Sequence, residues 1–280
     1  MHTNRNMAPL GGATRYKVNS CDRVVARQSA HLREPVFMGG RHKAGHDEYF
    51  MGAEVTSDLT NPQPVLSCWS GGKDSCLALY EIQKERAVAG LLTTVTRDFD
   101  RISMHGVRRL LLQRQAESLG LPLHEVFIAK GASNDEYEAA MGKAFESFRQ
   151  QGVSEIVFGD LFLEDIRAYR DRLLARLQMR GLYPVWDRNT ARTIRKFLDL
   201  GFKTAVVCVD PKKLDRSFVG RVLDDQFLSQ LPAGIDPCGE NGEFHTFVFD
   251  GPIFRRPVAF TFGEIVERDS FWFADLVPAT

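Results

Sequence analysis

Residues 65–82 read VLSCWSGGKDSCLALYEI, and this stretch decides the fold. Residues 65–69 form a short apolar run typical of a buried strand, and from Asp74 onward apolar residues recur at helical spacing. Gly71 and Gly72 therefore lie in a turn between a strand and a helix. Such a turn presents backbone N–H groups to an anion, and the positive end of the helix dipole adds to the attraction. A phosphate ligand is expected.

Two common phosphate-binding turns do not match this sequence. The Walker loop needs a glycine five positions before Gly72 and a serine or threonine after Lys73, where this chain has Asp74. The dinucleotide-binding fingerprint needs separated glycines, whereas Gly71 and Gly72 are adjacent. What remains is the hexapeptide of residues 70–75, SGGKDS, placed directly after a first strand.

Composition and charge are those of an ordinary globular protein. The chain has 280 residues, of which 44% are hydrophobic and 26% charged. Lys plus Arg equals Asp plus Glu, 36 each, so net charge gives no general attraction for nucleic acid or anionic membranes. No apolar run approaches the roughly 18 to 20 residues that cross a bilayer, and the N-terminus lacks an apolar signal core. We expect a cytoplasmic protein without a membrane partner.

The order of apolar and amphipathic segments predicts an α/β fold. Residues 1–60 mix Gly, Arg, His and Asn with few apolar residues, and we expect a disordered or weakly attached extension. Strands are predicted at VLSCW, GLLTTVT, HEVFIA, EIVFGD and TAVVCVD, with helices between them, one of which runs through Arg180. This pattern predicts a Rossmann-like, five-stranded parallel sheet with helices on both faces. Residues 61–209 form the predicted first domain, and residues 210–280 a smaller α+β domain.

The cysteines predict no disulfide framework and no structural zinc site. Their number is odd and none stands in a C-x-x-C pair. We interpret them as small buried hydrophobes, with a redox or sulfur-carrying role left open for the two that flank the glycine turn. The residues are Cys21, Cys68, Cys76, Cys208 and Cys238.

The hexapeptide resembles the PP-loop of the N-type ATP pyrophosphatases, which split ATP between the α and β phosphates. Four further motifs follow in order: SMHG at 103–106, GDLFLEDIRAYR at 159–170, PVW at 184–186 and GENGEFHTFVFDGPIF at 239–254. Together they resemble the diphthine-ammonia ligase family over about residues 65–254. The resemblance implies a sheet of the adenine nucleotide alpha hydrolase type.

The resemblance also implies a reaction. Members of the family use ATP and ammonia to convert the carboxylate of diphthine, a modified histidine on elongation factor 2, to an amide. Bacterial relatives share the motifs but lack that target, so their acceptor would be another small molecule or protein. The implied mechanism is adenylation of a carboxylate, then attack by ammonia in a site that excludes water, with AMP and pyrophosphate released. No glutaminase-like segment is visible, so we expect free ammonia as donor, ATP and Mg²⁺ as cofactors, and allow a homo-oligomer.

The resemblance assigns the loop to the nucleotide. The loop residues Ser70, Gly71, Gly72, Lys73, Asp74 and Ser75 are expected to hold the pyrophosphate. An exposed Lys73 would stabilise the leaving group, and Asp74 would place magnesium. His105, Gly159 and Asp160 are further nucleotide contacts, at the ends of predicted strands. A capping histidine and a helix-start carboxylate are the plainer interpretations of His105 and Asp160.

The remaining candidates concern the substrate. Arg167 and Arg170 lie three apart on one predicted helical face, suited to an anionic substrate or, more plainly, to solvent. This tract departs from the usual YQR-x-R form of the family. Glu240 and Glu243 of the tail motif would orient ammonia or take its proton. His245 and Thr246 would contact the substrate, although the family commonly has glutamate at position 245, and the turn could instead tie the second domain to the first.

Two other functions remain open. A tRNA-modifying PP-loop sulfurtransferase or lysidine-type ligase would need an RNA-binding surface and, for thiolation, paired cysteines, and the sequence shows neither. A non-catalytic module that binds adenine nucleotides would share the loop but produce no AMP.

Overall fold

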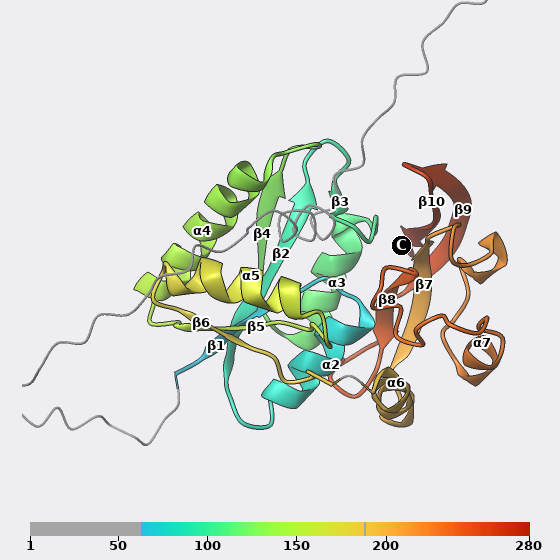
Figure 1. The fold of residues 1–280 in the computed structure, drawn as a ribbon, viewed down its shortest axis with the longest axis horizontal. Helices are drawn as coiled ribbons and strands as arrows, with labels where there is room; N and C mark the ends of the chain where they lie inside the picture. The colour runs from blue at the N-terminus through green and yellow to red at the C-terminus, as the bar shows by residue number, and fades with distance from the viewer. Residues whose placement is uncertain (1–62, 188) are drawn as a thin grey trace, which may run out of the picture.

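The computed structural model describes residues 63–187 and 189–280 and contains two sheets (Figure 1). The predicted N-terminal extension lies outside the described residues. Helices flank a largely parallel first sheet, and a smaller antiparallel sheet follows toward the C-terminus, so the predicted α/β class is confirmed. In the part of the chain that the structure describes, no helix has the length and apolar character needed to cross a membrane.

The first sheet has its strand order reversed next to β1. Its parallel strands are arranged in the order β4-β2-β1-β5-β6, and a short β3 pairs antiparallel with β2. Ligands of open α/β sheets bind at the carboxyl ends of the strands where the order reverses, here between β1 and β5. The strands are β1 (Val65–Cys68), β2 (Val88–Thr96), β3 (Arg101–Ile102), β4 (Leu123–Ile128), β5 (Glu155–Val157) and β6 (Arg180–Leu182).

Helices cover both faces of this sheet. On one side lie α2 (Lys73–Ile82) and α3 (Arg109–Leu119), and on the other lie α4 (Asn134–Gln150) and α5 (Glu164–Ala175). Along β1, Val65 packs into the cluster of α2 and α3, whereas Leu66 packs into the cluster of α4 and α5. Burial on both faces explains why the strands read as continuous apolar runs.

The second sheet packs against the outer side of α2 and α3, so the apolar cluster of these helices is shared by both parts of the chain. The sheet order is β8-β7-β10-β9, and every pair is antiparallel. Strand β8 packs on α2, so the second sheet lies directly beside the glycine turn. Its elements are α6 (Thr190–Asp199), β7 (Lys203–Val209), the 3-10 helix η2 (Arg216–Phe218), α7 (Asp225–Ser229), β8 (Phe244–Asp250), β9 (Phe260–Arg268) and β10 (Phe271–Pro278).

Two sequence predictions about the sheet are wrong. The run TAVVCVD was expected as the fifth parallel strand, but it forms β7 in the second sheet. The fifth parallel strand is β6, where a helix through Arg180 was expected; α5 ends at Ala175, and Gln178 adopts a φ of 55°, which a helix does not allow. The two sheets therefore divide between β6 and β7, and the boundary predicted after residue 209 follows β7 instead of preceding it.

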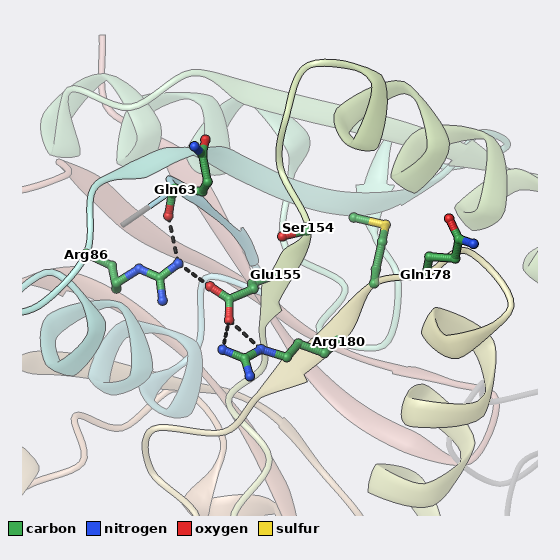
Figure 2. Close-up of a pocket in the computed structure, with 7 residues that line it drawn as sticks. Gln63, Arg86, Ser154, Glu155, Gln178 and Arg180 are labelled. Carbon is green, nitrogen blue, oxygen red and sulfur yellow. Dashed lines mark hydrogen bonds and ion pairs between the residues drawn. The ribbon is translucent and has the colours of Figure 1, made fainter. Parts of the chain in front are cut away.

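An ion cluster fixes the amino-terminal edge of the first sheet (Figure 2). The buried carboxylate of Glu155 on β5 accepts hydrogen bonds from Arg86 and Arg180, which approach from opposite sides. Arg86 also donates from Nη2 to the carbonyl oxygen of Gln63 at 2.7 Å. The cluster lines a cavity of about 440 Å³. Because it lies at the amino ends of the strands, opposite the edge at which such sheets bind ligands, we interpret it as structural.

Candidate nucleotide-binding site

The glycine turn of residues 70–75 joins β1 to α2 and is braced from within. Gly71 has a φ of 76°, a left-handed conformation that favours glycine, and Gly72 is the extended N-cap of α2. The hydroxyl oxygen of Ser70 accepts from the Gly72 N–H at 3.2 Å and lies 3.2 Å from Ser75 Oγ. Ser75 Oγ donates to the Gly72 carbonyl at 2.9 Å. Both hydroxyls predicted to contact pyrophosphate thus also hold the shape of the turn.

Strand β8 is bonded directly to this loop. The Lys73 N–H donates to Thr246 Oγ1 at 3.0 Å, and the Val248 N–H donates to the carbonyl of Gly71 at 2.9 Å. Thr246, predicted as a substrate contact, therefore touches the loop itself. These two bonds connect the conformation of the loop to β8, which supports the alternative that the tail motif ties the second unit to the first.

Lys73 carries a buried positive charge. Its side chain is 5% exposed, and Nζ donates to Oδ1 and Oδ2 of Asp74 at 2.8 and 2.6 Å. Burial lowers the pKa of Lys73, but the carboxylates of Asp74 and Glu240 more than offset this and raise it overall, so the group stays an ammonium. The expectation that Lys73 is exposed is wrong, because the adjacent Asp74 supplies a partner that allows the charge to be buried.

Glu240 brings a carboxyl group from the tail motif to the same place. Its Oε1 accepts from the Leu161 N–H at 3.0 Å, which joins the turn after Cys238 to the loop after β5. Burial, followed by repulsion from Asp74, raises the pKa of Glu240 to about 8, and Lys73 only partly opposes the rise. Glu240 is therefore poised to gain or lose a proton near neutral pH.

Asp74 lies among like charges. Burial raises the pKa of Asp74, Lys73 opposes the rise, and repulsion from Asp236 and Asp160 adds to it. Among the described residues, no three His, Cys, Asp or Glu side chains are arranged as a complete metal site. Mg²⁺ usually binds through one or two protein carboxylates and substrate phosphates, so the Asp74 carboxylate, which Lys73 already pairs with, could supply one ligand to this ion.

Gly159 supports the loop through its lack of a side chain. A Cβ at this position would lie 2.8 Å from the carbonyl carbon of Asp74 and 2.8 Å from the amide nitrogen of Ser75. The end of β5 therefore passes directly against the first turn of α2. The structure places this predicted nucleotide residue beneath the loop, where only glycine fits without moving the backbone.

The two arginines predicted to bind substrate have different partners. Arg170 pairs with Asp160, with Nε 2.8 Å from Oδ2 and Nη2 3.1 Å from Oδ1, and so orients a carboxylate at the end of β5. The Arg167 guanidinium carbon lies 4.6 Å from the ring centroid of Tyr183 and 4.8 Å from that of Trp186. The structure thus separates their roles, with Arg170 in the acidic cluster and Arg167 against the aromatic pair.

His105 and His245 lie side by side next to the loop. Their ring centroids are 4.8 Å apart, and His105 Nε2 lies 3.0 Å from where a Cβ on Gly72 would stand. Burial lowers the pKa of His105 well below 6.5, and His245 and Lys73 lower it further. His105 is therefore a neutral imidazole that contacts the loop without adding charge.

Glu243 bonds within its own turn. It is 3% exposed, and its Oε1 accepts from Asn241 Nδ2 at 3.2 Å and from the Asp236 N–H at 3.4 Å. Its carbonyl oxygen accepts from the Asp210 N–H at 2.9 Å. We therefore expect Glu243 to shape the turn that presents Glu240.

Two residues at the site were absent from the sequence prediction. Asp236 accepts at Oδ2 from the Glu240 N–H at 3.1 Å. Gln115 of α3 is completely buried and donates to the Gly71 carbonyl at 3.0 Å. A signal for Gln115 was present, because a glutamine stands on the apolar stripe of α3 that includes Leu111 and Leu119.

The cysteines of the described chain carry no reactive thiolate. Cys76, Cys208 and Cys238 are buried, and burial raises the pKa of each thiol. Burial also raises the pKa of Cys68, to about 12. Protonated thiols are poor nucleophiles, which favours the packing interpretation over sulfur transfer. Cys21 lies outside the described residues.

A glycine-rich loop at the switch point of a parallel sheet, with a lysine beside it, defines an α/β protein of the PP-loop class. The sequence matches the family models of the diphthamide synthase N-terminal domain over residues 64–181 and the diphthamide synthase C-terminal domain over residues 189–277. The chain belongs to the diphthamide synthase family. The first match ends at residue 181, within β6, and the second begins at residue 189, before α6 and β7, so the matches divide close to where the two sheets divide.

Two similar proteins are both named diphthine–ammonia ligase. The diphthine–ammonia ligase of Homo sapiens is 25% identical over 234 residues, which cover 75% of this chain and 87% of the relative. That of Danio rerio is 26% identical, with 75% and 91% covered. A solved structure, a predicted subunit of tRNA methyltransferase from Methanocaldococcus jannaschii, aligns with a TM-score of 0.36 and 15% identity over 67% of this chain and 96% of that one.

Proposed function

We propose that this protein is an ATP-dependent ligase that joins ammonia to a carboxylate and releases AMP and pyrophosphate. The observation that carries the proposal is the loop of residues 70–75, where a buried ammonium and a helix N-terminus meet a carboxyl group of raised pKa from the tail motif. Relatives named diphthine–ammonia ligase supply the acceptor, protein-bound diphthine. The family to which the chain belongs supports the same reaction class.

In the first half-reaction, a carboxylate oxygen of the acceptor attacks the α-phosphorus of ATP. The bond from that phosphorus to the oxygen bridging to the β-phosphate breaks, and pyrophosphate leaves with several negative charges. Lys73 and the loop amides at the start of α2 would stabilise this charge, and they act strongly because the site is buried. His105 helps by remaining neutral beside the loop, so it leaves the charge balance around Lys73 unchanged.

Asp74 is the residue proposed to hold Mg²⁺, together with phosphate oxygens. Its support is the repulsion from Asp160 and Asp236, which a bound cation would relieve. When bound, the ion would withdraw charge from the phosphates. Arg170 keeps Asp160 oriented at the same edge.

In the second half-reaction, the nitrogen of ammonia attacks the carbonyl carbon of the acyl-adenylate. The bond from that carbon to the AMP oxygen breaks, and the nitrogen gives up a proton. Glu240 is the proposed acceptor of this proton, because a pKa of about 8 leaves a useful fraction of the carboxylate at neutral pH and makes it a stronger base than an ordinary glutamate.

Mass spectrometry of the acceptor tests this function. A diphthine-containing polypeptide would be incubated with the protein, ATP, MgCl₂ and ammonium chloride, and both the acid-to-amide mass change and AMP would be measured. Equal amounts of amide and AMP, both lost when ammonium or acceptor is omitted, support the proposal. ATP binding without AMP would instead identify a nucleotide-binding module. AMP formation that depends on RNA and not on the carboxylate would identify an RNA-modifying enzyme.

A further inference from the structure

We infer that Gln115 is a positioning residue that sets the conformation of the glycine turn. It lies on α3, more than forty positions from the loop, and is completely buried. Its Nε2 donates to the Gly71 carbonyl at 3.0 Å and to the Val248 carbonyl at 2.6 Å, and its Oε1 accepts from Trp69 Nε1 at 3.0 Å. One amide group thus joins the end of β1, the loop and β8.

The direction of the bond to Gly71 explains what the residue does. The Gly71 carbonyl is held inward by two donors, Gln115 Nε2 and the Val248 N–H. The peptide is planar, so the Gly72 N–H in the same unit points the opposite way, toward Ser70 Oγ, to which it donates at 3.2 Å. The orientation of this peptide, and with it the shape of the turn, is therefore set before any ligand arrives.

The close approach of Gln115 also accounts for the glycine. A Cβ on Gly71 would lie 2.6 Å from Gln115 Oε1 and 3.2 Å from Leu112 Cδ1, and the φ of 76° adds strain for any other residue. Gln115 and Gly71 are thus a matched pair. A larger residue at position 71 would displace the glutamine, and with it the bond to β8.

Only a glutamine satisfies all three partners. The site offers one N–H, from Trp69, and two carbonyl oxygens, so it requires an acceptor and donors on one short planar group. The indole N–H can bond only to the oxygen, which fixes the orientation of the amide and directs Nε2 to Gly71 and Val248. Glutamate would lack the donors when ionised, and methionine would lack every hydrogen bond.

The prediction is that Gln115 acts through preorganisation. Without it the loop would still connect β1 to α2, but it would sample several conformations and lose entropy on binding phosphate. The inference rests on the proposed function only in taking ATP as the ligand. Loop order without nucleotide gives a readout independent of that choice.

The test compares Gln115→Met with Ser118→Ala. Ser118 lies one turn further along α3 and is also buried. Its Oγ donates to the Arg256 carbonyl at 2.5 Å and accepts from the Arg256 N–H at 3.1 Å, so Ser118 links α3 to the second unit without touching the loop. Both variants should have a lower Tm. Only Gln115→Met should weaken ATP binding, by about tenfold for the lost hydrogen bonds, in calorimetric titrations with MgCl₂. Only Gln115→Met should speed amide hydrogen exchange in residues 70–76 without nucleotide.

The results separate the inference from the proposed function. Suppose that amide exchange in the loop is faster in Gln115→Met than in the wild type, and that the wild type does not bind ATP. This pair of results would support the positioning role and refute the proposed function. If instead the wild type binds ATP, and Gln115→Met has the same affinity for ATP and the same rate of loop exchange as the wild type, the positioning role alone would be overturned. If Gln115→Met does not fold, Trp69→Phe removes the N–H that fixes the amide and should produce the same changes to a smaller degree. Unchanged loop exchange in that variant would also overturn the inference.

Discussion

Replacing Glu240 by glutamine should make the ligand-free protein more stable at alkaline pH while abolishing amide formation. Glutamine has the same shape and keeps an oxygen that can accept from the Leu161 N–H, so the link to the loop after β5 survives. The variant removes only the charge. It therefore isolates the electrostatic cost of a carboxylate buried near Asp74.

The sign follows from the direction of the pKa shift. Burial and Asp74 raise the pKa of Glu240 from 4.5 to about 8 in the folded protein. Between these values the folded chain holds a proton that the unfolded chain has lost, so the free energy of unfolding falls as pH rises. The cost is on the order of 4 kcal/mol at pH 8 and about 1 kcal/mol at pH 5. Glutamine avoids this cost at both values.

Urea unfolding of the wild type and Glu240→Gln at pH 5 and pH 8, without nucleotide, measures the difference. Glu264→Gln, which changes an exposed carboxylate on β9, is the control and should leave stability unchanged at both values. The reasoning fails if the gap between wild type and Glu240→Gln is the same at both pH values, or if the variant is the less stable protein at pH 8.

Three further predictions follow from the same structure. Gly159→Ala should weaken ATP binding about tenfold in calorimetric titrations, because its Cβ would displace the first turn of α2. The control is Gly142→Ala, in open space within α4, which should leave the free energy of unfolding unchanged or raise it by up to about 1 kcal/mol. Lys73→Met should lower Tm by leaving Asp74 unpaired, and adding Asp74→Asn should restore Tm but not AMP formation. Glu155→Gln should cost about 2 kcal/mol at pH 7 in urea unfolding. Because its arginine partners lower the pKa of Glu155 despite burial, that gap should close as pH falls below 4.5, and a gap that persists would contradict the assignment.

The parts of the fold that depend on local sequence could be predicted. The strand of residues 65–68, the glycine turn and α2 are contiguous in the sequence. The helix expected between HEVFIA and EIVFGD is α4, which begins after Ser133, a capping-box residue. The sheet assignment of β7 could not be predicted, since a strand buried on both faces reads alike in a parallel and an antiparallel sheet. The short β6 was missed because Arg180–Leu182 offers no period to detect.

In the candidate site too, residues that stand in sequence motifs could be predicted, whereas features that depend on tertiary contacts could not. The loop, His105, Asp160 and Glu240 stand in motifs, and the structure brings them to one edge of the sheet. The burial of Lys73 depends on the geometry of its ion pair, which spacing does not specify. Gln115 reaches the loop from another helix, so only its place on an apolar stripe gave a sign of it.

The central claim is that the ammonium of Lys73, at the start of α2, grips the phosphate end of ATP. Calorimetric titration of ATP with MgCl₂ into the wild type and into the Lys73→Met, Asp74→Asn double variant tests it directly, because the double variant removes both charges of the pair together. We predict saturable binding by the wild type and a loss of at least about tenfold in affinity for the variant. Equal affinities, or no binding by the wild type at saturating ATP, would contradict the account.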